Sequence, residues 1–119
     1  MSNKLVAIVN HEPGVKNMLT LVFEARDLAV VSYHRGEDLL SMAIESNLGA
    51  VVMGTNMGAN RRGYDICKSL LKRRPELPII GLSADPKDCK KWIDSGASYF
   101  MAEPFRPYVL LNTVRSYLD

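Results

Sequence analysis

The stretch AVVMGTNMG, residues 50–58, is the part of the sequence that decides the fold class. Its first four residues are apolar and uncharged, which is typical of a strand buried on both faces, as in a parallel sheet. In an open parallel sheet, binding and chemistry lie just beyond the carboxyl ends of such strands. Gly54 stands at that end. The stretch therefore predicts the functional edge of a sheet at a residue that has no side chain.

Outward from this stretch, short apolar runs alternate with amphipathic ones along the chain. The runs predict five strands, at Leu5–Val9, Leu28–Ser32, Ala50–Met53, Ile79–Ser83 and Ser98–Met101. Apolar residues spaced for one face of a helix fall between these runs and after the last. Asp85 followed by Pro86 predicts the start of the fourth helix, and Gly96 predicts its end. Alternating strands and helices predict an α/β protein with a parallel sheet and helices on both faces.

The composition is that of one ordinary globular domain, which we expect to span residues 1–119. The net charge of +2 favours neither a nucleic acid nor a membrane surface as a direct partner. The apolar run Leu5–Val9 is too short for a signal peptide or a membrane span, so we expect a cytoplasmic protein, with no effector domain in these 119 residues. Cys67 and Cys89 are expected to be structural thiols, because no second thiol lies at short spacing and no histidine is near either.

Three further stretches resemble one known family. They are VNHEP at residues 9–13, LPIIGLSA at 77–84 and GASYFMAEPF at 96–105. In this order they resemble the response-regulator receiver family, also called CheY-like, over Lys4–Leu118. The resemblance implies a three-layer, doubly wound (βα)5 fold of the flavodoxin-like type, with five parallel strands in the order 2-1-3-4-5. It also implies a role in two-component signal transduction and phosphorelay.

The resemblance places the family's phosphorylation site on residues that have lost its chemistry. The acidic pair that binds Mg²⁺ corresponds to Asn10 and His11, and the phosphoacceptor aspartate corresponds to Gly54. The family's hydroxyl remains as Ser83, but its lysine corresponds to Glu103, which would repel a phosphoryl group. Magnesium prefers charged oxygen ligands, which Asn10 and His11 do not offer. We therefore predict no phosphorylation here, no bound Mg²⁺ or other metal or cofactor, and no catalytic residue or enzymatic activity.

If the strand ends converge, three interpretations of the remaining side chains stay open. In the favoured one, His11 pairs with Glu103, because a buried Glu without a partner is costly. In the second, the cleft senses a small molecule or a transition metal through His11, Ser83 and Glu103, with or without Asn10, although two good ligands are too few for a closed zinc site. In the third, a Ser-His-Glu triad makes a hydrolase, but Ser83 lacks the Gly-x-Ser-x-Gly turn of such nucleophiles. Glu12 is a poor replacement for the lost carboxylates, because it begins the turn before Pro13 and need not point inward; the simpler interpretation is an acid in the first turn of a helix, favoured by the helix dipole.

Partner binding is the function that survives these losses. Phe100 corresponds to the aromatic residue that turns inward on activation in the family, and Lys90, Lys91 and Tyr108 are candidates for a partner face. That face would comprise the fourth helix, the fifth strand and the fifth helix. Trp92 belongs either to it or to the core. We expect a pseudo-receiver that acts by phosphorylation-independent protein interaction, with a signalling protein, an effector domain or a second copy of the chain as partner.

Overall fold

The computed structural model describes residues 4–42, 47–58 and 61–118, and within them it contains one five-stranded parallel sheet. The strands are β1 (Leu5–Val9), β2 (Ala29–Tyr33), β3 (Leu48–Gly54), β4 (Ile79–Ser83) and β5 (Tyr99–Ala102). Their spatial order is β2-β1-β3-β4-β5. The predicted α/β fold and strand order are therefore confirmed. Each strand begins and ends within two residues of the predicted position.

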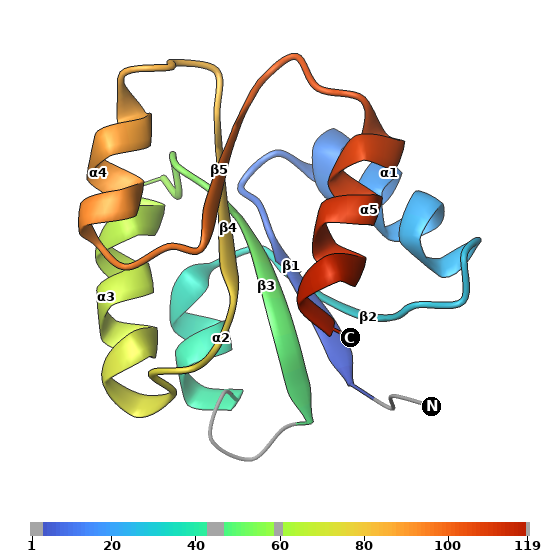
Figure 1. Cartoon of the computed structure of the whole chain (residues 1–119), viewed down its shortest axis with the longest axis horizontal. Coiled ribbons are helices and arrows are strands. Elements are labelled where there is room, and N and C mark those ends of the chain that lie inside the picture. Colours follow the sequence, from blue (N-terminus) through green and yellow to red (C-terminus); the bar gives the residue numbers. More distant parts are fainter. Residues whose placement is uncertain (1–3, 43–46, 59–60, 119) are drawn as a thin grey trace.

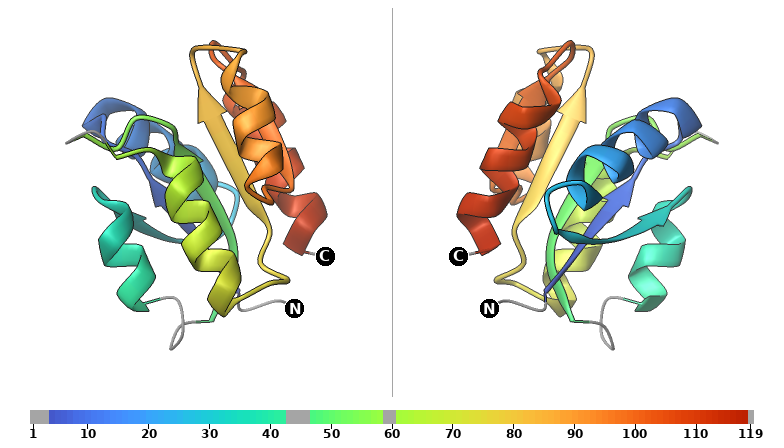
Figure 2. Two further views of the ribbon diagram at one scale, coloured as in Figure 1. Left: turned by 90° about the vertical axis from the view of Figure 1, so that its left-hand side faces the viewer. Right: turned by 90° about the vertical axis from the view of Figure 1, so that its right-hand side faces the viewer.

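Helices cover both faces of the sheet and make the three layers that were predicted. They are α1 (Pro13–Glu24), α2 (Gly36–Met42), α3 (Gly63–Arg73), α4 (Asp88–Asp94) and α5 (Pro107–Leu118). Figure 1 views the sheet close to edge-on, with α2, α3 and α4 on its left and α1 and α5 on its right. Figure 2 shows the same two helical layers from either side. None of the helices in the described ranges is both long enough and apolar enough to cross a membrane.

The central strands are buried because helices cover both of their faces. In β3, Val51 and Met53 pack into the cluster beneath α2, α3 and α4, whereas Ala50 and Val52 pack into the cluster beneath α1 and α5. Every residue of β3 is buried. This two-sided burial explains why the strand is apolar throughout rather than alternating.

Trp92 of α4 belongs to the core. Its side chain is fully buried, and its ring packs against two glycines. A Cβ atom at Gly81 of β4 would overlap the Trp92 ring, and one at Gly63 would lie 2.9 Å from it and would overlap the Gly54 carbonyl oxygen. The alternative placement of Trp92 on a partner face is therefore wrong.

The fourth helix begins later than Asp85 and Pro86 predicted. Asp85 does cap a turn, because its Oδ1 accepts the N–H of Lys87 at 2.9 Å and its carbonyl accepts the N–H of Asp88 at 3.1 Å. Regular helix starts only at Asp88, after this turn. The predicted end is confirmed, since Gly96 adopts the left-handed backbone conformation with φ of 98°.

The two cysteines lie in different environments. Cys67 is buried in α3, where burial raises the pKa of its thiol to about 12. Cys89 is exposed on α4. Both are free thiols, so only Cys67 matches the expected structural role.

Candidate functional site

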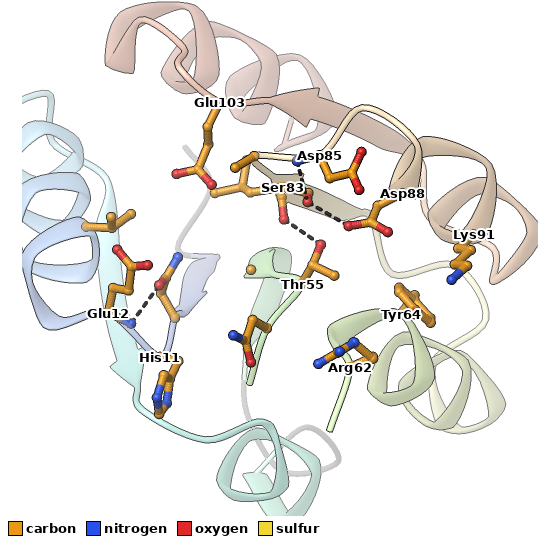
Figure 3. Close-up of a pocket in the computed structure, with 16 residues that line it drawn as sticks. His11, Glu12, Thr55, Arg62, Tyr64, Ser83, Asp85, Asp88, Lys91 and Glu103 are labelled. Atoms are coloured by element: carbon orange, nitrogen blue, oxygen red, sulfur yellow. Dashed lines mark hydrogen bonds between the residues drawn. The ribbon is translucent and has the colours of Figure 1, made fainter. Parts of the chain in front are cut away.

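A cleft of about 470 Å³ opens at the carboxyl ends of the strands (Figure 3). All five residues that the sequence assigned to the degenerate site line it, namely Asn10, His11, Gly54, Ser83 and Glu103. Parallel strands end at the same edge of a sheet, which brings together residues far apart in the chain. The predicted location of the site therefore agrees with the fold.

Asn10 organises the loop after β1 and covers the place where Gly54 lacks a side chain. Its Oδ1 accepts the N–H of Glu12 at 2.9 Å, and the residue is only 9% exposed. A Cβ atom at Gly54 would lie 3.0 Å from Asn10 Nδ2. The amide of Asn10 therefore borders the position that a side chain at residue 54 would occupy.

The hydroxyl of Ser83 is already committed to the loop between β4 and α4. It donates to Asp88 Oδ2 at 2.7 Å and accepts the N–H of Asp85 at 3.0 Å. Thr55 makes a second link nearby, donating to the Leu82 carbonyl at 2.7 Å and accepting the indole N–H of Trp92 at 2.7 Å. These hydrogen bonds tie α4 to the ends of β3 and β4.

His11 does not pair with Glu103, so the favoured interpretation of these two residues is wrong. No ion pair joins them among the residues that the structure describes, and they lie on different sides of the cleft (Figure 3). The imidazole of His11 instead contacts that of His34, with ring centroids 5.1 Å apart. Because Ser83 bonds to Asp88 and His11 lies beside His34, the hydrogen-bonded chain of a Ser-His-Glu triad is not formed either.

Glu103 faces another carboxylate instead of a cation. It is partly buried, and its pKa is raised, first by burial and then by the negative charge of Glu12. Glu12 lines the cleft, an inward position that the sequence did not require (Figure 3). The turn held by Asn10 explains this, since it fixes the backbone of Glu12 over the strand end.

We expect Glu103→Gln to raise the melting temperature at about pH 7 relative to the parent. The folded state holds the Glu103 proton more tightly than the unfolded state, so stability falls as pH rises through the raised pKa. The gain should shrink as the pH falls and vanish toward about pH 3, below the ordinary Glu pKa of about 4.3, where the carboxyl is protonated in both states. Thermal unfolding of both proteins, followed by circular dichroism at several pH values down from about pH 7, measures the difference in melting temperature.

Glu76→Gln is the matched control, because the hydrogen bond from Arg74 lowers the pKa of that exposed carboxyl. This substitution should give no gain at neutral pH. Equal gains in melting temperature from Glu103→Gln and Glu76→Gln would show that the raised pKa of Glu103 is not the cause.

The cleft as a whole is more acidic than the sequence indicated. Glu12, Asp85, Asp88 and Glu103 line it, opposed by Arg62 and Lys91. From the sequence, Glu103 was the one carboxylate assigned to the cleft, because residues in loops follow no periodic pattern that reveals where their side chains point. No group of three or more His, Cys, Asp or Glu side chains that could hold a metal ion occurs within the described ranges.

Two of the four candidate partner-face residues also make cation–π contacts within the molecule. Lys91 lies with its Nζ 5.6 Å from the centre of the Tyr64 ring and lines the cleft. Tyr108 is exposed, and the guanidinium of Arg26 lies over one face of its ring, 4.9 Å from the ring centre.

The other two candidates, Phe100 and Lys90, have different surroundings. Phe100 is partly buried and packs against the cluster beneath α2, α3 and α4. Lys90 pairs with Asp94 one turn further along α4, at 2.9 Å.

Comparison with known proteins agrees with the fold and with the arrangement of the strand ends. The sequence profile of the response regulator receiver domain family matches residues 6–115. The chain belongs to this family. It is a receiver domain of two-component response regulators, a class of signal-transduction proteins.

Individual relatives support this assignment. Transcriptional regulatory protein TdiR of Thauera aromatica is 31% identical over 115 residues, which cover 95% of this chain and 50% of TdiR. A putative response regulator from Chloroflexus aurantiacus has a similar structure, with a TM-score of 0.89, 25% identity and 97% of each chain covered. The BeF3-activated receiver domain of DrrB gives a TM-score of 0.85 at 26% identity, again over 97% of each chain. This receiver domain spans about half the length of the curated relatives that it matches.

Proposed function

We propose that this receiver domain signals without being phosphorylated, by binding a partner protein through a surface that is always available. The observation that carries the proposal is Gly54, which ends β3 at the edge where the family's phosphoacceptor aspartate is expected. Glycine offers no nucleophile. The domain is accordingly a pseudo-receiver and not an enzyme.

The electrostatics of the cleft support the proposal. A bound phosphoryl group needs a cation beside it, yet Glu103 stands where the family's lysine is expected, and Glu12 adds a second negative charge. Asn10 contributes a neutral amide whose oxygen already accepts a hydrogen bond. The magnesium site is therefore proposed to be lost, together with the phosphoacceptor.

The surface proposed for the partner is formed by α4, β5 and α5. Four large apolar side chains are exposed on these elements, namely Ile93 at 49%, Tyr99 at 42%, Tyr108 at 54% and Val109 at 50%. The Ser83–Asp88 and Thr55–Trp92 hydrogen bonds hold α4 in place, which suits a surface that need not switch. The proposed partner is a signalling protein, an effector domain or a second copy of the chain. We propose that this binding takes place in the cytoplasm and that the domain itself contacts neither a nucleic acid nor a membrane.

A titration with Mg²⁺ and beryllofluoride, followed by NMR, tests the loss of phosphorylation. We expect no saturable shifts at Asn10, Gly54 or Ser83, because residue 54 offers no carboxylate to the phosphoryl mimic, and Asn10, His11 and Glu103 stand where the family's acidic pair and lysine are expected. The receiver domain of DrrB, whose structure is BeF3-activated, is the positive control. Saturable shifts centred on these three residues would overturn the proposal.

A further inference from the structure

Both histidines of the chain lie at one place in the fold. His11 follows β1 and His34 follows β2, and these strands are parallel neighbours in which Val9 pairs with Tyr33. The N–H of Asn10 donates to the Tyr33 carbonyl at 3.2 Å, which extends the pairing beyond the strands. The next side chains therefore come side by side, with both imidazoles exposed to solvent.

The geometry points to a metal site: we propose that His11 and His34 together bind one divalent transition-metal ion of the Zn²⁺ or Cu²⁺ class. Their ring centroids are 5.1 Å apart and their planes are tilted by 35°. In a tetrahedral chelate, a metal–nitrogen distance of about 2.05 Å and a nitrogen-to-centroid distance of about 1.15 Å give centroids about 5.2 Å apart. The spacing of the two centroids therefore fits a shared ion once one nitrogen of each exposed ring turns toward it.

The absence of a side chain at Gly58 leaves room for the His11 ring. Gly58 lies against His11, and a Cβ atom there would be 2.9 Å from His11 Cε1. Gly58 also adopts φ of 77°, a conformation that favours glycine, so a larger side chain is disfavoured on two counts.

The ligand chemistry selects the class of ion. Imidazole nitrogen suits zinc and copper, whereas magnesium requires oxygen ligands. No third His, Cys, Asp or Glu completes a metal-binding group in the part of the chain that the structure describes, so water would fill the remaining positions. The site thus shares position 11 with the family's magnesium site but differs from it in its ion, in its ligand atoms and in its use of the β2 end. A bound ion would link the loop after β1 to the loop after β2.

The test is a titration of the full chain, with any affinity tag removed, using Zn²⁺ and in parallel Cu²⁺. Cys89→Ser serves as the parent, because Cys89 is the exposed thiol whereas burial raises the pKa of the Cys67 thiol. Calorimetry gives the affinity, and NMR of the ring protons on imidazole Cε1 locates the ion. We expect one equivalent to bind, with the ring protons of both histidines shifted by Zn²⁺ and broadened by paramagnetic Cu²⁺, tighter binding of Cu²⁺ than of Zn²⁺, and no effect of Mg²⁺.

His11→Gln and His34→Gln distinguish a chelate from two separate ligands. Each single variant should weaken binding by at least about tenfold, because losing one ligand removes the gain from holding two together. The double variant should be little weaker than either single one. A smaller loss in either single variant, independent losses that add, or shifts centred on Ser83 and Glu103 would overturn the proposal. Both side chains are exposed, so the variants should fold, and circular dichroism checks this.

Discussion

Replacing Trp92 with alanine is expected to lower the free energy of unfolding by about 3–5 kcal/mol, a large part of the stability of a domain of this size. The side chain is fully buried, and it joins α4 to β4 and to the start of α3. Its indole N–H also donates a hydrogen bond to the Thr55 hydroxyl. Urea denaturation followed by circular dichroism measures the loss. A change below about 1 kcal/mol would show that α4 does not depend on this side chain.

A double-mutant cycle separates the ring contact from general burial. Gly81→Ala alone should cost about 1–3 kcal/mol or more, because the added methyl group overlaps the Trp92 ring. In the Trp92→Ala background the same substitution should cost little, since the obstructing ring is gone. Gly14→Ala is the matched control, because no atom lies within 4 Å of a Cβ at that position. Equal costs of Gly81→Ala in both backgrounds would contradict the packing argument.

Restoring aspartate at position 54 is expected to leave the domain unphosphorylated by acetyl phosphate. The new side chain would meet Asn10 Nδ2, with its Cβ 3.0 Å away, and could accept a hydrogen bond from that amide. It would still lack the ligands for Mg²⁺ and would face Glu103 and Glu12. Mass spectrometry after incubation with acetyl phosphate and Mg²⁺ detects any phosphoaspartate. Efficient labelling of Gly54→Asp would show that Gly54 is the sole defect.

The complementary variant carries four substitutions, Asn10→Asp, His11→Asp, Gly54→Asp and Glu103→Lys. It should gain Mg²⁺-dependent labelling, because it restores the metal ligands, the nucleophile and the cation together. The control carries Gly54→Asn with the other three substitutions unchanged, since it keeps the shape of the site without the nucleophile. Labelling in this control, or no labelling in the variant with all four restored groups, would contradict the assignment of the lost functions to these four positions.

The sheet was predictable because its central strands are buried on both faces and therefore apolar throughout. The prediction missed the start of β3 at Leu48 and Gly49, since glycine is not typical of strands. Here Gly49 is required because a Cβ would lie 2.6 Å from Lys4 Cβ. The start of α4 was missed for a different reason, because Asp85 and Pro86 make a turn of their own before the helix.

The location of the site was also predictable, whereas the directions of its side chains were not. Strand order alone brings Asn10, Gly54 and Ser83 to one edge. The inward position of Glu12 and the bond from Ser83 to Asp88 depend on loop backbone that has no sequence period. His34 was missed although a signal existed, since the order β2-β1 places the residues after these two strands next to each other.

The unequal burial of Cys67 and Cys89 gives these 119 residues a single site for chemical labelling. Maleimides and similar reagents attack the thiolate, so the buried Cys67, with its raised pKa, should remain unmodified. Cys89 is exposed on α4, the helix that contributes to the proposed partner surface. A fluorophore attached there would report docking at that surface by anisotropy, without any engineered residue.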